Sequence, residues 1–131
     1  YHESGNPVSF AADLARIAKK QSKRLEQVDR GVKFRAFNMA ARQTRVDTGR
    51  LRGDWQVTQD MPATGPSGVE DKTPQGAGGL RPDELKKITT FANTFLTNTM
   101  PYAVVWEERD GMVARTIADI ERIVKEEAAK P

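Results

Sequence analysis

The run Val46-Asp47-Thr48-Gly49-Arg50-Leu51-Arg52-Gly53-Asp54-Trp55 decides the fold, because it reverses the chain between a helical pattern and an extended one. Asp47 and Thr48 can hydrogen-bond to nearby backbone, and Gly49 supplies a positive φ that residues with a β-carbon resist. An extended segment after this turn places Trp55 and Val57 on a buried face. The same alternation places the polar residues on the other face, namely Arg52, Asp54, Gln56 and Thr58.

A long helix is predicted before this turn, over residues 9–42. Ser9 is the expected amino-terminal cap, and the helix would be roughly 50 Å long at about 1.5 Å per residue. Gly31 costs about 1 kcal/mol relative to Ala inside a helix and is a candidate bend. The apolar positions recur at helical spacing: Phe10, Leu14, Ile17, Leu25, Val28, Val32, Ala36 and Met39.

Residues 60–82 are rich in Pro and Gly and predict a long, flexible loop. A loop of this length is commonly functional or disordered, so it is a candidate for a segment that becomes ordered only against a neighbour. A tolerated hairpin insertion is the alternative. The Gly-rich stretch 76–79 is not followed by Gly-Lys-Ser or Gly-Lys-Thr, which excludes a phosphate-binding loop.

The rest of the chain predicts a short helix, two strand segments and a final helix. Pro82 followed by two acids starts the short helix, and strands are expected at 94–99 and 102–107. An amphipathic helix follows Gly111. The fold class is therefore α+β, as one domain over residues 1–131 with a long amino-terminal helix, a small antiparallel sheet and a carboxyl-terminal packing helix.

Composition and charge add limits on the kind of protein. The chain has 131 residues, 37% hydrophobic, and no Cys, which excludes disulfides and cysteine-ligated zinc. Without a signal peptide or membrane-spanning pattern, we expect a soluble protein made inside the cell. Residues 1–53 hold 12 Lys and Arg against 5 Asp and Glu, a balance of +7, and residues 54–131 hold 9 against 13, a balance of −4. Such polarity favours head-to-tail contacts between copies, although solvated helical surfaces explain it too.

A second run, Asn98-Thr99-Met100-Pro101-Tyr102-Ala103-Val104-Val105-Trp106-Glu107, follows the first at a distance of about fifty residues. Together the two runs resemble the neck and tail-completion proteins of long-tailed bacteriophages, the HK97 gp10-like family. The first block is matched by Asp47, Thr48, Gly49, Arg50, Leu51, Arg52 and Trp55, and the second by Asn98, Pro101, Tyr102, Ala103 and Glu107. The chain departs from the family where Glu108-Arg109-Asp110 replaces a longer polar loop before the last helix.

The resemblance implies a structural virion protein at the head–tail junction, assembled in the bacterial cytoplasm. Such proteins join the tail to the DNA-filled head and commonly form sixfold rings. The implied partners are copies of the chain itself and the head-closure, connector, tail-terminator or tail-tube proteins, with no membrane and no cofactor. DNA passing through the neck is a further contact.

Basic residues of the long helix are the candidate contacts with subunits or with DNA: Lys19, Lys20, Lys23, Arg24, Arg30, Lys33 and Arg35. A nucleic-acid-binding module that uses these residues on phosphates is the alternative function from a different class. It leaves the acidic half of the chain and both sequence runs without a role.

An enzyme is the third possibility, and the sequence offers it no catalytic residue and no metal site. The single histidine, His2, lies in the leader, where it makes a poor general base. The Asp-Thr-Gly triplet is shared with aspartic proteases, but the basic residues after it and the short chain oppose that interpretation. Asp47 is expected to form a turn. Glu107 is expected to end a strand and to pair with an Arg. Tyr102 and Trp106 are expected in the core or at an interface.

Overall fold

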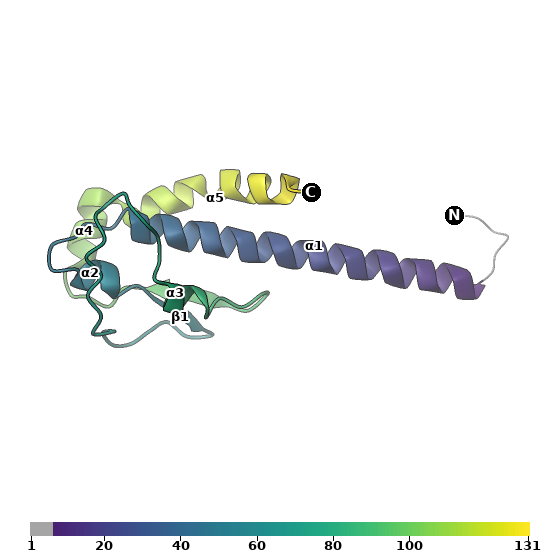
Figure 1. The fold of residues 1–131 in the computed structure, drawn as a ribbon, viewed down its shortest axis with the longest axis horizontal. Coiled ribbons are helices and arrows are strands. Elements are labelled where there is room, and N and C mark those ends of the chain that lie inside the picture. The colour runs from purple at the N-terminus through teal and green to yellow at the C-terminus, as the bar shows by residue number, and fades with distance from the viewer. Residues whose placement is uncertain (1–6) are drawn as a thin grey trace.

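The computed structural model describes the backbone of residues 7–131 and the side chains from residue 19 onward. It confirms the predicted α+β fold, with a long amino-terminal helix, a two-stranded antiparallel sheet and a carboxyl-terminal helix that packs on the first (Figure 1). The elements in chain order are α1 (Pro7–Arg42), α2 (Arg50–Gly53), β1 (Gln56–Gln59), α3 (Pro82–Leu85), β2 (Thr94–Thr97), α4 (Ala103–Asp110) and α5 (Met112–Ala129).

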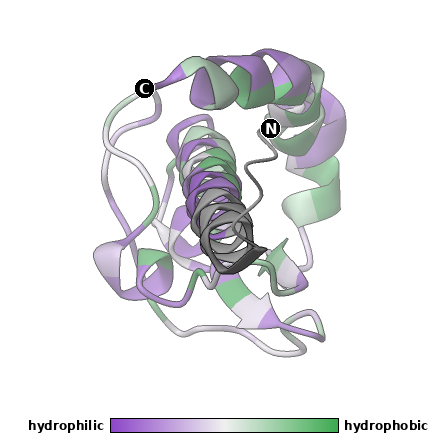
Figure 2. Cartoon of the chain, turned by 90° about the vertical axis from the view of Figure 1, so that its right-hand side faces the viewer, coloured by the Kyte–Doolittle hydropathy of each residue, from purple (hydrophilic) through white to green (hydrophobic). Residues whose placement is uncertain are grey.

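The helix α1 lies between α5 and the sheet, as the view along its axis shows (Figure 2). Its carboxyl-terminal half carries small buried residues, Ala36, Ala40 and Ala41, which let neighbouring backbones approach closely. The helix begins at Pro7, two residues before the predicted cap, and proline suits the first turn because its missing N–H has no partner there. The core therefore forms around one end of α1.

The two strands pair in antiparallel register, with Val57 opposite Leu96. Trp55 and Val57 are 3% and 1% exposed, which confirms the prediction that they are buried. The predicted first strand segment at 94–99 is confirmed over Thr94–Thr97. The core cluster joins residues from every layer: Ala41, Leu51, Trp55, Val57, Leu80, Ile88 and Met112.

The prediction of an extended segment directly after Gly49 was wrong. Residues Arg50–Gly53 form one helical turn, α2, and the strand begins only at Gln56. Arg52 and Asp54, expected on the solvent face, are each only 1% exposed. The alternation rule failed because the polar groups of these two side chains find partners in the loop that follows β1.

The predicted strand at 102–107 was also wrong, because residues Ala103–Asp110 form helix α4. Ala103 and Trp106 are three residues apart and pack against the core, while Val104 and Val105 are 67% and 50% exposed. The residue composition favoured a strand, but the inward positions follow the helical period. Helix α4 ends at Gly111, whose φ of 62° turns the chain into α5.

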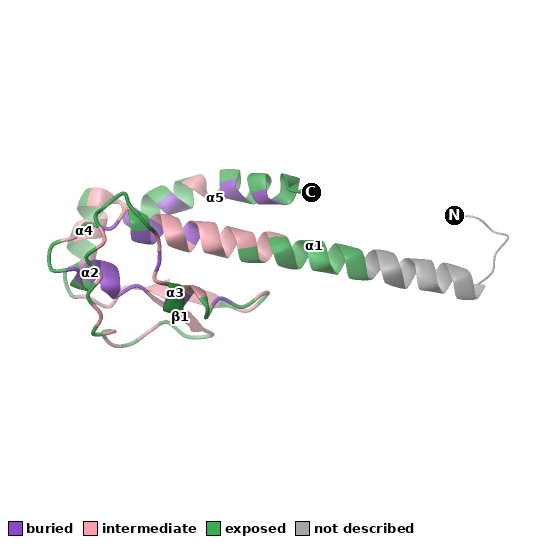
Figure 3. Cartoon of the chain, viewed as in Figure 1, coloured by how far each residue is buried: buried purple, intermediate pink, exposed green. Residues whose placement is uncertain are grey.

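The loop of residues 60–81 has no helix or strand, as predicted, but contacts within the chain hold its path. The Gly76 amide donates to the carbonyl of Arg42 at 2.8 Å, and the Leu80 amide donates to Asn38 Oδ1 at 2.8 Å. Exposed and half-buried residues alternate over 62–74, whereas residues 75–78 are exposed and Leu80 is buried (Figure 3). An additional ordering of this loop by a neighbouring protein stays a prediction.

Gly31 has a packing role that the sequence did not indicate. A β-carbon at this position would lie 1.9 Å from Glu127 Oε1, where α5 approaches α1. The buried Glu127 carboxylate is held by Arg35 at 3.2 Å and by Lys130 at 2.6 Å. The glycine therefore makes room for an ion pair between the two helices.

Gly53 is the sharpest test of the close contact between α2 and the loop. A β-carbon there would lie 2.1 Å from the carbonyl oxygen of Val69, a backbone atom that cannot rotate away. Gly53→Ala should lower the free energy of unfolding by about 1–3 kcal/mol, measured by urea denaturation. Gly65→Ala is the matched control, because nothing lies within 4 Å of the added carbon. Equal stability of the two variants would contradict the contact.

Candidate functional site

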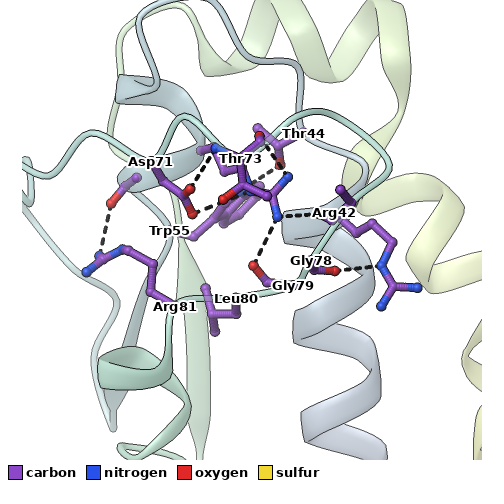
Figure 4. A network of polar contacts seen from close by, with 12 residues as sticks. Arg42, Thr44, Trp55, Asp71, Thr73, Gly78, Gly79, Leu80 and Arg81 are labelled. Carbon is purple, nitrogen blue, oxygen red and sulfur yellow. Dashed lines mark hydrogen bonds and ion pairs between the residues drawn. The ribbon is translucent and has the colours of Figure 1, made fainter.

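The guanidinium of Arg52 organises the first sequence run. It donates to four loop carbonyls, those of Thr73 at 3.2 Å, Pro74 at 3.0 Å, Ala77 at 2.6 Å and Gly79 at 3.2 Å. Figure 4 shows the polar contacts around this part of the loop, among them the hydrogen bond from Arg42 to the Gly78 carbonyl at 2.7 Å. One buried side chain thus fixes the path of residues 73–79.

The Asp71 carboxylate compensates the charge of Arg52, with Oδ2 lying 3.4 Å from Nε. Burial lowers the pKa of Arg52, and the nearby Asp71 charge opposes that change. Burial alone would raise the pKa of Asp71, but hydrogen bonds from Thr73 and the charges of Arg52 and Arg81 lower it below its usual value. The pair is therefore ionised on both sides at neutral pH.

Gly49 places the loop against the turn. Its φ is 89°, and its carbonyl accepts hydrogen bonds from the amides of Gly53 at 2.9 Å and Asp71 at 2.8 Å. A β-carbon would meet the Asp71 backbone at 2.9 Å. Positive φ and close approach both require glycine here. Asp47 and Thr48 lie exposed in the turn, and Thr48 Oγ1 accepts from the Arg50 amide at 3.3 Å.

Asp54 joins the two sequence runs. Its buried carboxylate accepts hydrogen bonds from the Ser67 amide at 2.8 Å and the Thr99 hydroxyl at 2.9 Å. Next to it, Asn98 Nδ2 donates to the Leu51 carbonyl at 2.7 Å. Residues more than forty positions apart in the chain therefore meet in one hydrogen-bonded unit.

Trp55 ties the same unit to the end of α1. Its indole Nε1 donates to Thr44 Oγ1 at 2.7 Å, and Thr44 in turn donates to the Ala40 carbonyl at 2.8 Å. Both side chains are buried. Helix, turn and strand are thus connected through one buried chain of hydrogen bonds.

Glu107 caps α5 and does not end a strand beside an Arg, which corrects that expectation. Its two oxygens accept from the amides of Val113 at 2.8 Å and Ala114 at 3.0 Å. These amides belong to the first turn of α5, where backbone N–H groups lack helical partners and favour negative charge.

Trp106 of α4 forms a cation–π contact with Arg45, which follows the end of α1. The guanidinium carbon of Arg45 lies 4.2 Å from the Trp106 ring centroid, and that of Arg109 lies 5.6 Å away. Arg45 also forms two 3.1 Å hydrogen bonds with the Asp110 carboxylate. This pairing raises the pKa of Arg45 and lowers that of Asp110.

Both sequence runs line one surface hollow of about 400 Å³. Its walls combine turn residues with α4 and its approach: Arg45, Asp47, Arg50, Leu51, Tyr102 and Trp106. Tyr102 is 38% exposed, and Pro101 beside it is also exposed. The hollow offers aromatic and charged side chains together, a combination suited to protein contact.

The structure separates the seven basic candidates into two groups. Lys33 and Arg35 are engaged within the chain, Lys33 with Asp29 at 2.9 Å and Arg35 with Glu126 at 2.6 Å. The remaining five are exposed: Lys19, Lys20, Lys23, Arg24 and Arg30. Arg24 also donates to the Ala128 carbonyl at the end of α5.

The sequence pattern missed the loop partners of the turn. Asp71 and Asn38 hold the loop, yet neither belongs to a recognised run. The signal that could have indicated Asp71 is its place two residues before Thr73, a typical turn arrangement in which the Asp side chain accepts from that amide, here at 3.0 Å.

Comparison with protein-family models, with curated proteins and with solved structures finds no match. Across residues 19–131, the side chains of His, Asp and Glu form no group of three able to hold a metal ion. Among the described helices, none is long and apolar enough to cross a membrane. His2 lies outside the described residues.

Arg52→Gln tests whether the buried guanidinium holds the loop. The variant leaves Asp71 without its charge partner and frees several carbonyls, so the free energy of unfolding should fall by about 3–5 kcal/mol. Amides of residues 71–79 should also exchange with solvent faster. Arg50→Gln is the matched control, because Arg50 is 67% exposed and 3.7 Å from Glu70, a pair worth at most about 1 kcal/mol. A loop that keeps its protection in Arg52→Gln would contradict this role.

Proposed function

We propose that this chain is a structural virion protein of a tailed bacteriophage and forms a ring at the head–tail junction that joins the tail to the DNA-filled head. The observation that carries the proposal is the junction of the two family-like sequence runs through Leu51, Asp54 and Asn98. The residues that resemble the family thus act on one another as a structural unit. The proposed partners are copies of the chain and head-closure, connector, tail-terminator or tail-tube proteins.

The contacts of the two runs support a structural role. Arg52 binds carbonyls, Glu107 binds helix amides and Trp55 binds a threonine hydroxyl, so all three side chains are engaged within the fold. Assembly of a ring requires contact surfaces between subunits and no catalysed reaction. An interface of standard size, about 1,600 Å², repeated around a ring would hold such an assembly without covalent links.

Charge reversal on α1 tests the ring. Lys20→Glu with Lys23→Glu should weaken ring formation and tail joining, because the exposed basic segment of one subunit faces an acidic surface of the next. The measurements are molar mass by light scattering after size exclusion and joining of purified heads to tails assembled without this protein. We expect a discrete hexamer, or a monomer that forms a ring only on the tail, from the unaltered chain.

The matched control is Lys86→Glu, compared with Lys20→Glu alone, because it makes the same charge change at an exposed position outside α1 and outside the loop of residues 60–81. It should leave both assembly and joining intact. The proposal would be contradicted if the unaltered chain stays monomeric and does not bind tails. It would also be contradicted if the charge-reversed variant of α1 assembles and joins heads to tails normally.

Binding to duplex DNA is the second candidate function, favoured by the exposure of Lys19, Lys20, Lys23 and Arg24 along one segment of α1. Affinity should fall steeply with salt, with a slope of about −0.9 per phosphate contacted. The Lys20→Glu, Lys23→Glu variant should contact about two fewer phosphates, so the salt dependence of its affinity should be correspondingly less steep. The affinity is measured by fluorescence anisotropy with a labelled duplex. No binding at low salt would exclude this function.

A further inference from the structure

Helix α5 has two apolar faces, and α1 covers only one of them. Met112 and Ile123 are 1% and 0% exposed and face α1. A second stripe follows the spacing four, three, four along the helix and is formed by Val113, Ile117, Ile120 and Val124. Three of its members are exposed, Val113 at 38%, Ile117 at 63% and Val124 at 39%. An apolar stripe of this length left in water is the usual mark of a docking surface.

The exposed stripe continues into an open groove of about 220 Å³ beside α1. Phe37 and two alanines of α1 form one wall and Leu96 of β2 forms another, and α5 completes the lining with Val113, Thr116, Ile117 and Ile120. A groove with these walls suits the apolar face of a helix.

The length of α1 indicates what could fill this groove. Helix α1 has 36 residues and α5 has 18, so at about 1.5 Å per residue α5 can lie along only half of α1. The contact between Arg24 and Ala128 marks where α5 ends on it. Residues 19–27 are all exposed, with Leu25 at 59%. This half of α1 extends beyond the rest of the fold (Figure 1).

The sequence of this half of α1 matches the stripe on α5. In the sequence, Phe10, Leu14 and Ile17 recur at the helical spacing four, three. The segment from 19 to 24 contains four Lys or Arg and no acid, whereas residues 103–131 contain 7 Asp or Glu against 5 Lys or Arg. Glu121, 83% exposed, flanks the stripe one turn after Ile117 and forms an exposed ion pair with Lys125 at 3.2 Å. Apolar spacing and charge thus complement each other.

We infer that the amino-terminal half of α1 from a second copy of this chain packs into the groove formed by α1, β2 and the exposed stripe of α5. This inference rests on the self-association proposed above and assigns it a surface. The chain's own α1 cannot fold back onto the groove because it is one continuous helix. The donor helix and the acceptor groove lie on different parts of each subunit, so the contact is head-to-tail and can close into a ring.

Cysteine cross-linking tests the contact, because the chain has no cysteine of its own. One tagged copy carries Ile17→Cys, and a second, differently tagged copy carries Val113→Cys, Ile117→Cys or Val124→Cys. Mild oxidation should give a mixed disulfide between the copies for at least one of these pairs. Ala118→Cys is the matched control, exposed on α5 but off the stripe. Equal cross-linking to position 118 would overturn the inference.

Ile117→Asp provides a second measurement, and Ala118→Asp provides its control. Placing a carboxylate in the groove should weaken self-association tenfold or more, because a charged group would replace an aliphatic side chain that the contact buries. Self-association unchanged in Ile117→Asp would overturn the inference. Normal self-association with lost tail joining would also overturn it, because the groove would then hold a different protein. Copies that cross-link through the stripe but never join tails would support the inference and contradict the proposed function.

Discussion

The buried guanidinium of Arg52 is the interaction on which the turn and the loop both depend. It is 1% exposed and binds four carbonyls of a loop that has no secondary structure to satisfy them. Unpaired carbonyls in such a position would cost more than their hydrogen bonds contribute. Asp71 balances the charge, which makes burial of the arginine tolerable. Helix α2 carries this side chain, and its guanidinium is directed toward the loop carbonyls.

Asp54 is a second buried charged residue whose hydrogen-bond partners come from distant parts of the chain. Its carboxylate gathers donors from the loop and from the segment after β2, and Asn98 completes the junction through the Leu51 carbonyl. The two sequence runs are therefore joined in one hydrogen-bonded unit, which holds the segment that leads into α4. Glu107 then fixes the start of α5 by binding its first amides. The surfaces offered to partners are consequences of these internal contacts.

The proposals for function and for the groove use different parts of the molecule. The first rests on the junction of the two runs near α2, and the second rests on α5 and on the length of α1 beyond it. The basic candidates divide in the same way. Lys33 and Arg35 serve the fold, whereas the exposed residues from Lys19 to Arg24 lie where another molecule can reach them.

The sequence by itself determined the long helix, the short helix at Pro82, the closing helix after Gly111 and the burial of Trp55 and Val57, because apolar periodicity and turn residues act locally. Only the tertiary structure decided that Arg52 and Asp54 turn inward, because their hydrogen-bond partners other than Gln56 lie 13 or more residues away along the chain. It also decided that Ala103–Asp110 is a helix, since packing of Ala103 and Trp106 on the core overrode the strand propensity of the valines. Local rules give the elements, and long-range polar contacts choose which face of each element is buried.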